Sequence, residues 1–484
     1  MIYSSSVLLV LSIVTSASTT NAFSIPRQTA YRTSQRWFAT PDEELTQSLY
    51  NGNLRQAAQI LEQNPLIELS RETFGKVFDC IEQTTEQAEE NSINTRLVAQ
   101  QQQQQQAQYP PQSPARMDMT RMYQTLRDNG KLTFFGAGEA QPIASGSKTV
   151  TPLLLEEITN LSMTSLTPKP NNSLLFAGIA LATAEALCAL TLGWNLNAMV
   201  FLTLLAALVD RAFVNGAVFE TIIRTVQPKL QSKILRHEAG HFLCAYLLGC
   251  PVEGCVLSGW AALQDARFDK RQVTAGTSFF DPALSREMNS GRVTRGSIDR
   301  YSVIVMAGIA AEAMNFGGAD GGAGDEMALV AFLSQLNTPN NASKSTGQVW
   351  NNVSIRNQAR WGALQAVLLL REYKACYDGL VDALERGGNL GDCIYAIEQA
   401  GRDAGLKPMT RPLGWILDQG DYGMWSTNPP PAEMTLDPPG AKSLTIPPRV
   451  ILNDAEAAQA LIDAKQFMEN RLNDINEKLK SLDE

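Results

Sequence analysis

The amino-acid sequence predicts a mainly α-helical protein, and three features carry this prediction. Apolar residues recur at helical spacing over residues 43–91. Two long apolar runs follow at 173–193 and 196–209, and a helical pattern of apolar residues resumes after residue 350. A period near 3.6 residues indicates helices, whereas strands alternate with a period of 2. We expect only a few strands, between residues 254 and 280.

The length and composition restrict the classes of protein that fit. At 484 residues the chain exceeds the size at which a single core usually stops growing, so we expect two or more folded units. The net charge of −9 offers no basic patch, and we exclude nucleic acid as a partner. Seven cysteines, an odd number without a C-x-x-C pair, fit neither a disulfide framework nor a four-thiolate zinc site. We expect these cysteines to be buried as small hydrophobic residues.

Residues 1–40 indicate a presequence made of a signal peptide followed by a transit peptide. An apolar run too short to span a bilayer is followed by small residues, and then by a Ser/Thr-rich stretch with arginines and no acid before Asp42. The Ala22-Phe23 pair resembles the bipartite presequences of algae with secondary plastids. This resemblance implies a plastid membrane as the destination. Plain secretion, which would place the protein in a membrane of the secretory pathway, is the alternative.

Two segments without recognisable chemistry come next. Residues 43–98 predict a small helical unit. Residues 99–115 form a low-complexity linker, in which seven consecutive glutamines precede several prolines. Such a composition cannot bury a core, so we expect a domain boundary there.

The two apolar runs predict a transmembrane helical hairpin over residues 173–215. About 20 residues are needed to cross a bilayer, so the first run qualifies, and the second does so only if it continues past Asp210 and Arg211. Basic residues on both sides of the hairpin put the downstream domain on the stromal or cytoplasm-equivalent side. The alternative is a buried hairpin of a soluble domain, since Glu185 and Asp210 are costly against lipid.

The only two histidines of the chain lie in one pentapeptide, HEAGH at 237–241, within an amphipathic helix predicted over 231–248. Residues four apart share one face of a helix, so both imidazoles can reach one Zn²⁺ while Glu238 projects beside a metal-bound water. We therefore predict His237 and His241 as zinc ligands and Glu238 as the general base. The alternative, an ordinary core helix, would more often use Leu or Ala than two imidazoles that need partners.

A catalytic zinc usually has three protein ligands, and the chain has no third histidine. The third ligand must then be a carboxylate or a thiolate. A predicted helix with the sequence Gly-Ile-Ala-Ala-Glu at 308–312 leads into glycines and ends in the acids Asp325 and Glu326. Glycines there allow close approach of the backbone.

These motifs together resemble the FtsH-type membrane-bound zinc peptidases, and the resemblance covers about residues 230–400. It implies a zincin-like helical peptidase domain whose third zinc ligand is an Asp placed three residues after a Gly-Ala pair. Counting from Gly322-Ala323 reaches Glu326, so this sequence has Glu where the family has Asp. The apolar residues that follow favour Glu326 as the ligand, with Asp325 as the second choice.

The chain departs from that family by lacking an ATPase module. The hairpin and HEAGH are separated by a short segment, and no G-x-x-x-x-G-K-[ST] motif occurs. The sequence thus resembles the ATPase-less FtsH-like branch of plants and algae. The resemblance implies a membrane-anchored zinc metalloendopeptidase for membrane or stromal protein substrates, with unfolding power supplied by an AAA ATPase partner. A catalytically silent membrane scaffold or assembly factor that partners an ATPase is the competing hypothesis.

Two segments complete the chain. Residues 405–450 are rich in proline and glycine and predict a linker. Residues 453–484 carry a heptad-like apolar stripe on a charged helix. This coiled-coil-like pattern predicts homo-oligomerisation or docking to a partner, with an ordinary surface helix as the alternative.

Overall fold

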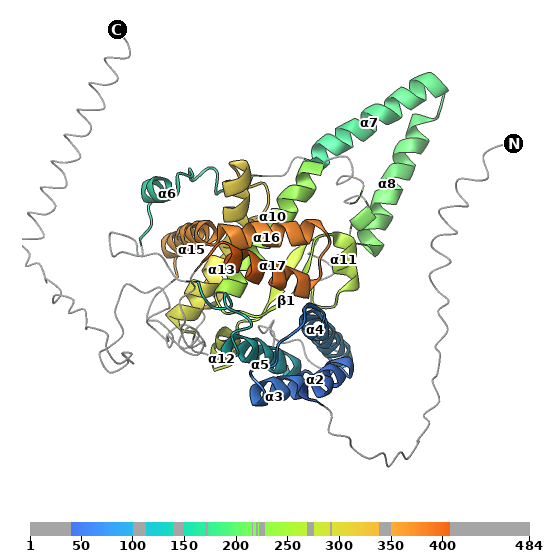
Figure 1. Ribbon diagram of the computed structural model, residues 1–484. Helices are drawn as coiled ribbons and strands as arrows, with labels where there is room; N and C mark the ends of the chain where they lie inside the picture. Colours follow the sequence, from blue (N-terminus) through green and yellow to red (C-terminus); the bar gives the residue numbers. More distant parts are fainter. Residues whose placement is uncertain are drawn as a thin grey trace, which may run out of the picture. The chain divides into compact units, whose positions relative to one another are not determined.

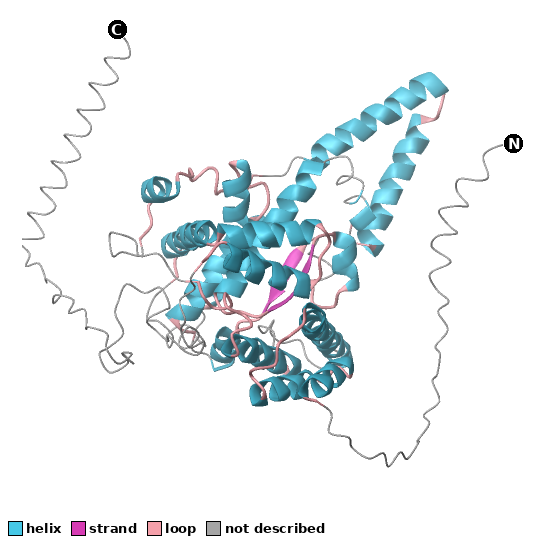
Figure 2. Cartoon of the chain, viewed as in Figure 1, coloured by secondary structure: helices cyan, strands magenta, loops and turns pink. Residues whose placement is uncertain are grey.

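The structure is a computed structural model, and it is mainly helical, as the sequence predicts (Figures 1 and 2). The presequence, most of the glutamine tract, nearly all of the 405–450 linker and the 453–484 stripe lie outside the described residues. The described residues are 40–99, 113–138, 149–169, 173–214, 216–218, 221, 228–268, 275–290, 293–337 and 350–406.

Four helices, α2 (Pro41–Tyr50), α3 (Leu54–Gln63), α4 (Arg71–Ala99) and α5 (Pro114–Asp128), make up the N-terminal part. The helices α2, α3 and α5 each begin after a residue whose side chain caps the helix N-terminus. Thr40 and Glu43 form a reciprocal capping box at α2. Asn53 caps α3, and Ser113 caps α5 just before a proline at its first position.

These helices are not an independent unit, which corrects the boundary expected at the glutamine tract. The helix α3 packs on α5, and α4 packs on α17 (Leu390–Asp403). Buried residues of all four helices belong to the same hydrophobic core as the C-terminal helices. The helices on either side of the glutamine tract therefore belong to one core, because α5 packs on α3 and α4 packs on α17.

Three long helices form the centre of the fold: α10 (Pro228–Leu247), α13 (Arg295–Phe316) and α15 (Asn352–Glu372). The helix α13 lies between the other two and packs on both. Glycines permit the close approach: a Cβ on Gly240 would lie 2.6 Å from the carbonyl oxygen of Ala307, and one on Gly362 would lie 2.7 Å from that of Ser302. The site described below lies between α10 and α13, so the packing of these two helices determines how far apart its side chains are.

Shorter helices surround this centre. The helix α13 ends at Gly317, which has a φ of 73°, and a turn of glycines leads to α14. Gly322, at the start of α14, has a φ of 89° that non-glycine residues rarely adopt. The remaining helices are α6 (Pro152–Thr159), α11 (Gly259–Gln264), α12 (Pro282–Ser290), α14 (Ala323–Gln335) and α16 (Lys374–Glu385).

Two strands, β1 (Val252–Val256) and β2 (Gly276–Phe279), form an antiparallel pair. Cys255 pairs with Thr277, and a register irregularity lies between Val252 and Gly254. The strand β2 also packs against α10. This register places Thr277 beside the helix that carries HEAGH.

The helices α7 (Ser173–Leu192) and α8 (Leu196–Phe213) lie side by side as a hairpin (Figure 1). Gly193, with a φ of 70°, makes the turn between them. Among the described residues, α8 is the helix that is long and apolar enough to cross a membrane, whereas the apolar part of α7, Gly178–Leu192, is shorter. Only 6% of α8 is buried, so it is not a core helix.

The two acids of the hairpin do not project from it. Glu185 accepts a hydrogen bond from the hydroxyl of Thr203 on the facing helix. Asp210 accepts one from the backbone N–H of Val218, at 3.1 Å. Both acids are 7% exposed. The two carboxylates are therefore not exposed on the apolar surface of the hairpin, where a charged group would be energetically costly.

The cysteines follow the expectation of small hydrophobic residues for the most part. All seven are free thiols, and Cys80, Cys244, Cys250, Cys376 and Cys393 are buried while Cys188 and Cys255 are half-buried.

A buried ion pair joins the N-terminal helices to the strand pair. Arg116 of α5 binds the carboxylate of Glu253 in β1 through two hydrogen bonds, at 2.6 and 3.1 Å, and contacts Glu89 of α4 at 3.3 Å. The side chain of Glu253 is fully buried and also accepts a hydrogen bond from Ser278 of β2. Loss of the guanidinium would leave a buried carboxylate with one hydroxyl as its side-chain donor.

We therefore expect Arg116→Met to lower the free energy of unfolding by about 3–5 kcal/mol, because removing one partner of a buried pair leaves the other charge uncompensated. Denaturant unfolding of the purified full-length chain measures this. Arg55→Met is the matched control, since Arg55 pairs with Asp118 on the surface, and it should cost less than about 1 kcal/mol. Equal effects of the two substitutions would contradict the assigned role of Arg116.

Candidate metal centre

The two histidines of HEAGH lie one turn apart on α10 and face α13. Their rings meet edge to face, with centroids 4.7 Å apart. The Nε2 atoms of His237 and His241 are 3.0 Å apart. Both residues are less than one tenth exposed. The spacing of four residues therefore brings two nitrogen donors to one point, as the helix geometry predicts.

Asp325, in the first turn of α14, supplies the third donor. Its Oδ2 atom lies 2.9 Å from Nε2 of His237 and 3.4 Å from Nε2 of His241. Zinc bonds of about 2.0–2.2 Å in a tetrahedron place neighbouring donor atoms about 3.3 Å apart. The three separations of 2.9, 3.0 and 3.4 Å are close to that spacing. The donor set fits one tetrahedral metal ion with a fourth position left for water.

Hydrogen bonds fix which nitrogen of each ring faces the centre. Nδ1 of His241 lies 2.7 Å from the carbonyl oxygen of Ile304, which can only accept, so this Nδ1 carries a proton. Nδ1 of His237 lies 2.8 Å from Oε1 of Glu312, which accepts in the same way. When both rings are neutral, the two Nε2 lone pairs point at each other and at the Asp325 carboxylate. Three acceptors this close favour a cation between them.

Glu312 is itself held by the turn that leads to α14. Its carboxylate accepts hydrogen bonds from the backbone N–H groups of Asp320, at 2.8 Å, and Gly321, at 3.2 Å. A Cβ on Gly321 would lie 2.6 Å from Oε1 of Glu312, so only glycine fits there. We did not predict a role for Glu312. The available signal was one acid inside an otherwise apolar stretch of a buried helix.

The electrostatics of the cluster favour positive charge. Burial lowers the pKa of His237, but hydrogen bonds with Asp325 and Glu312 outweigh it and raise the pKa to about 10. Burial likewise lowers the pKa of His241, and the charge of Asp325 raises it overall. Burial raises the pKa of Asp325, yet the charges of the two rings and their hydrogen bonds hold it well below its usual range. A metal cation at the same point would compete with these protons.

Glu238 lies beside the cluster without joining it. It is 6% exposed, and Oε2 accepts a hydrogen bond from the hydroxyl of Thr277 at 3.0 Å. Burial raises the pKa of Glu238, and the charges of His241 and His237 offset this only in part. A raised carboxylate pKa suits a group that must both take and return a proton. The contact with Thr277 was not visible in the sequence, because the pairing of β1 with β2 creates it.

The space in front of the histidines is kept open by a glycine of α13. A Cβ on Gly308 would lie 2.4 Å from Nε2 of His237 and 2.5 Å from Nε2 of His241. A side chain at this position would therefore collide with both imidazoles and displace them.

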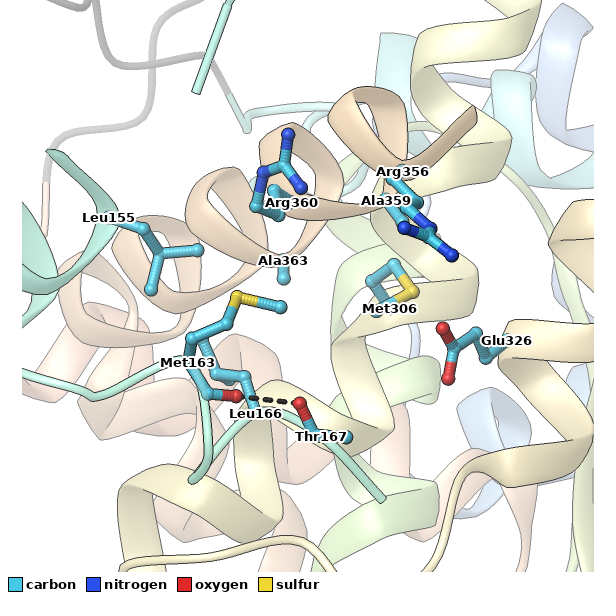
Figure 3. A pocket seen from close by; sticks show the side chains of 10 residues that line it. All are labelled: Leu155, Met163, Leu166, Thr167, Met306, Glu326, Arg356, Ala359, Arg360 and Ala363. Atoms are coloured by element: carbon cyan, nitrogen blue, oxygen red, sulfur yellow. Dashed lines mark hydrogen bonds between the residues drawn. The ribbon is translucent and has the colours of Figure 1, made fainter. Parts of the chain in front are cut away.

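The structure brings Asp325, and not the preferred Glu326, to the two histidines. Glu326 is exposed and lines a separate pocket, where its carboxylate is drawn on the side of Arg356 (Figure 3). The buried face of α14 carries Leu329, Phe332 and Leu333. Asp325 lies on that face because it precedes Leu329 by four residues, whereas Glu326 is turned about 100° away. The apolar residues used to set the phase misled us, since Met327 is 72% exposed.

Comparisons with protein-family models, with curated proteins and with solved structures gave no match for this chain. The assignment of the cluster therefore depends on its geometry and on the chemistry of its residues.

We expect Asp325→Asn to weaken zinc binding at least about 100-fold, because the variant loses the anionic donor of the set. Glu326→Gln is the adjacent control and should bind zinc as the unmodified chain does. Competition with a chromophoric zinc chelator measures both affinities. Unchanged affinity in Asp325→Asn together with a loss in Glu326→Gln would restore the original assignment.

We also expect zinc affinity and metal-free stability to change with pH in opposite directions. Because the folded pKa of His237, about 10, exceeds the unfolded value of 6.5, its contribution to stability is complete below pH 6.5. That contribution is lost as the pH rises through about 10. Zinc affinity should increase over the same range, since the metal displaces the proton. Unfolding of the chelator-treated chain at several pH values measures the trend in stability, and zinc titrations over the same pH range measure the trend in affinity. The substitution His237→Gln should flatten the pH dependence of the stability.

Proposed function

We propose that this chain is a membrane-anchored zinc metalloendopeptidase that hydrolyses peptide bonds of membrane or stromal proteins and has no ATPase module of its own. The observation that carries the proposal is the convergence of His237, His241 and Asp325, with the carboxylate of Glu238 beside them. Two imidazoles, one carboxylate and a neighbouring general base are the parts that a zinc peptidase needs.

A zinc ion held by His237, His241 and Asp325 would polarise the scissile carbonyl group and lower the pKa of a water molecule. The protein supplies the other functions. Glu238 accepts the proton of the attacking water and can return it to the leaving nitrogen, which its raised pKa favours. Thr277 donates a hydrogen bond to Oε2 of Glu238 and so restrains this side chain.

The surroundings of the cluster keep the donors in place. Glu312 and the carbonyl group of Ile304 hold both imidazoles in the tautomer whose Nε2 can bind a metal ion. Low exposure of the two histidines limits competing water and strengthens the interaction of the carboxylates with positive charge. These contacts agree with the resemblance of the sequence motifs to the FtsH-type peptidases. That resemblance supports a zincin-like peptidase domain over residues 230–400.

The membrane part of the proposal rests on the α7–α8 hairpin. Its large apolar side chains are exposed, including Phe201 at 64% and Leu208 at 66%, while its acids are satisfied internally. An exposed apolar hairpin with buried acids suits a lipid environment. We place it in a plastid membrane on the strength of the presequence pattern, with a secretory-pathway membrane as the alternative. Folded substrates would require an AAA ATPase partner.

One observation favours the second candidate function, a metal-binding scaffold or assembly factor without catalysis. His237, Glu238 and His241 are each less than a tenth exposed. A protein substrate must reach these groups, whereas a purely structural zinc site gains from being closed. The two functions differ in whether Glu238 matters for anything beyond metal binding.

The test compares zinc content and cleavage of casein, which needs no unfolding, for the full-length chain and for Glu238→Gln. We expect about one zinc per chain in both, and a loss of cleavage of at least about 100-fold in the variant, because only the general base is removed. Zinc in both proteins with cleavage in neither would support the scaffold. Absence of zinc from both would remove the metal centre from consideration.

A further inference from the structure

A second concave site lies between α6, α13, α14 and α15, apart from the metal cluster (Figure 3). Its volume is about 190 Å³. The floor is apolar and consists of side chains that are at most 5% exposed: Leu155, Leu166, Met306 and Ala363. Small residues at 359 and 363, one turn apart on α15, create the hollow. A floor of this kind favours an apolar ligand group of modest size.

Two arginines border the pocket on one side. Arg356 and Arg360 lie one turn apart on α15, and Figure 3 shows both side chains at the same border. Nε of Arg360 donates to the carbonyl oxygen of Val150 at 2.6 Å, which fixes that side chain. Burial and the neighbouring charge of Arg356 lower the pKa of Arg360. In the described part of the chain, Arg356 forms no ion pair or hydrogen bond.

Among the described residues that line the pocket, Glu326 is the one acid. It forms no ion pair with either arginine in the described part of the chain, although its carboxylate is drawn on the side of Arg356 (Figure 3). Two guanidinium groups and one carboxylate leave a surplus of one positive charge at the mouth of an apolar hollow. A singly charged anion balances that surplus, whereas a phosphate dianion would be repelled by Glu326 and would gain nothing from the floor.

We propose that this pocket binds a carboxylate joined to a small apolar group. The carboxylate lies against Arg356 and Arg360, because guanidinium groups bind carboxylates through paired, charge-assisted hydrogen bonds. The apolar group covers Leu166, Met306 and Ala363. Two sources present this chemistry: the C-terminal residue of a peptide with an apolar side chain, and a fatty acid.

Calorimetric titration of the full-length chain tests the proposal with three probes: N-acetyl-leucine, its amide and octanoate. Each titration is run with zinc bound and again after removal of zinc with a chelator, since a carboxylate can also bind the metal. We expect saturable binding of a carboxylate probe in both states, and at least about tenfold weaker binding of the amide. Preference for N-acetyl-leucine identifies a peptide terminus as the source, and preference for octanoate identifies a fatty acid.

Two variants assign the binding to this pocket. Arg356→Gln should weaken binding at least about tenfold, and it should fold normally because Arg356 is exposed. Ala359→Leu should block binding, because the larger side chain fills the hollow. Leucine is a good helix former, so the substitution should leave α15 intact. Arg386→Gln, at an exposed arginine outside the pocket, is the control for charge alone. The proposal is overturned by equal binding of acid and amide, by binding that requires zinc, by unchanged affinity in Arg356→Gln, or by the absence of saturable binding.

Discussion

The buried carboxylate of Glu312 holds three parts of the protein in one arrangement. It accepts a hydrogen bond from Nδ1 of His237 on α10, it belongs to α13, and it accepts two backbone N–H groups of the turn before α14. A carboxylate that is 2% exposed is costly unless its oxygens are satisfied, and here they are. Because the turn is bound at this point, α14 begins where Asp325 reaches the two imidazoles. The metal cluster is thus a consequence of one polar contact in an apolar helix.

A second chain of contacts reaches Glu238, the proposed general base, from the N-terminal helices. Arg116 binds Glu253 in β1, Glu253 accepts a hydrogen bond from Ser278, and the neighbouring Thr277 donates to Glu238. Residues Ser278 and Thr277 point to opposite faces of β2, as successive strand residues do. One face is anchored in a buried ion pair, and the other orients the base. The helix α5, which follows the glutamine tract, therefore supports the strand that positions Glu238.

The sequence alone predicts the features that depend on residues close together in the chain. The helix carrying HEAGH, the shared face of His237 and His241, and the apolar hairpin all follow from local periodicity, and the structure contains them. Features that depend on contacts across the chain were missed or misjudged. The apolar residues that follow the acids favour Glu326 in the sequence, but one of them, Met327, is exposed in the structure. The partners of Glu312 and Thr277 come from distant elements, so the sequence does not reveal them.

The exposure of the donors indicates from which side the cluster can be reached. The side chains of His237 and His241 are each 10% exposed, whereas that of Asp325 is 31% exposed. The open side of the cluster is therefore the first turn of α14. Solvent or a peptide must approach past that turn, where Met327 presents an exposed apolar side chain. The same turn carries Glu326 into the second pocket, so a displacement of α14 would change the donor set and the pocket border together.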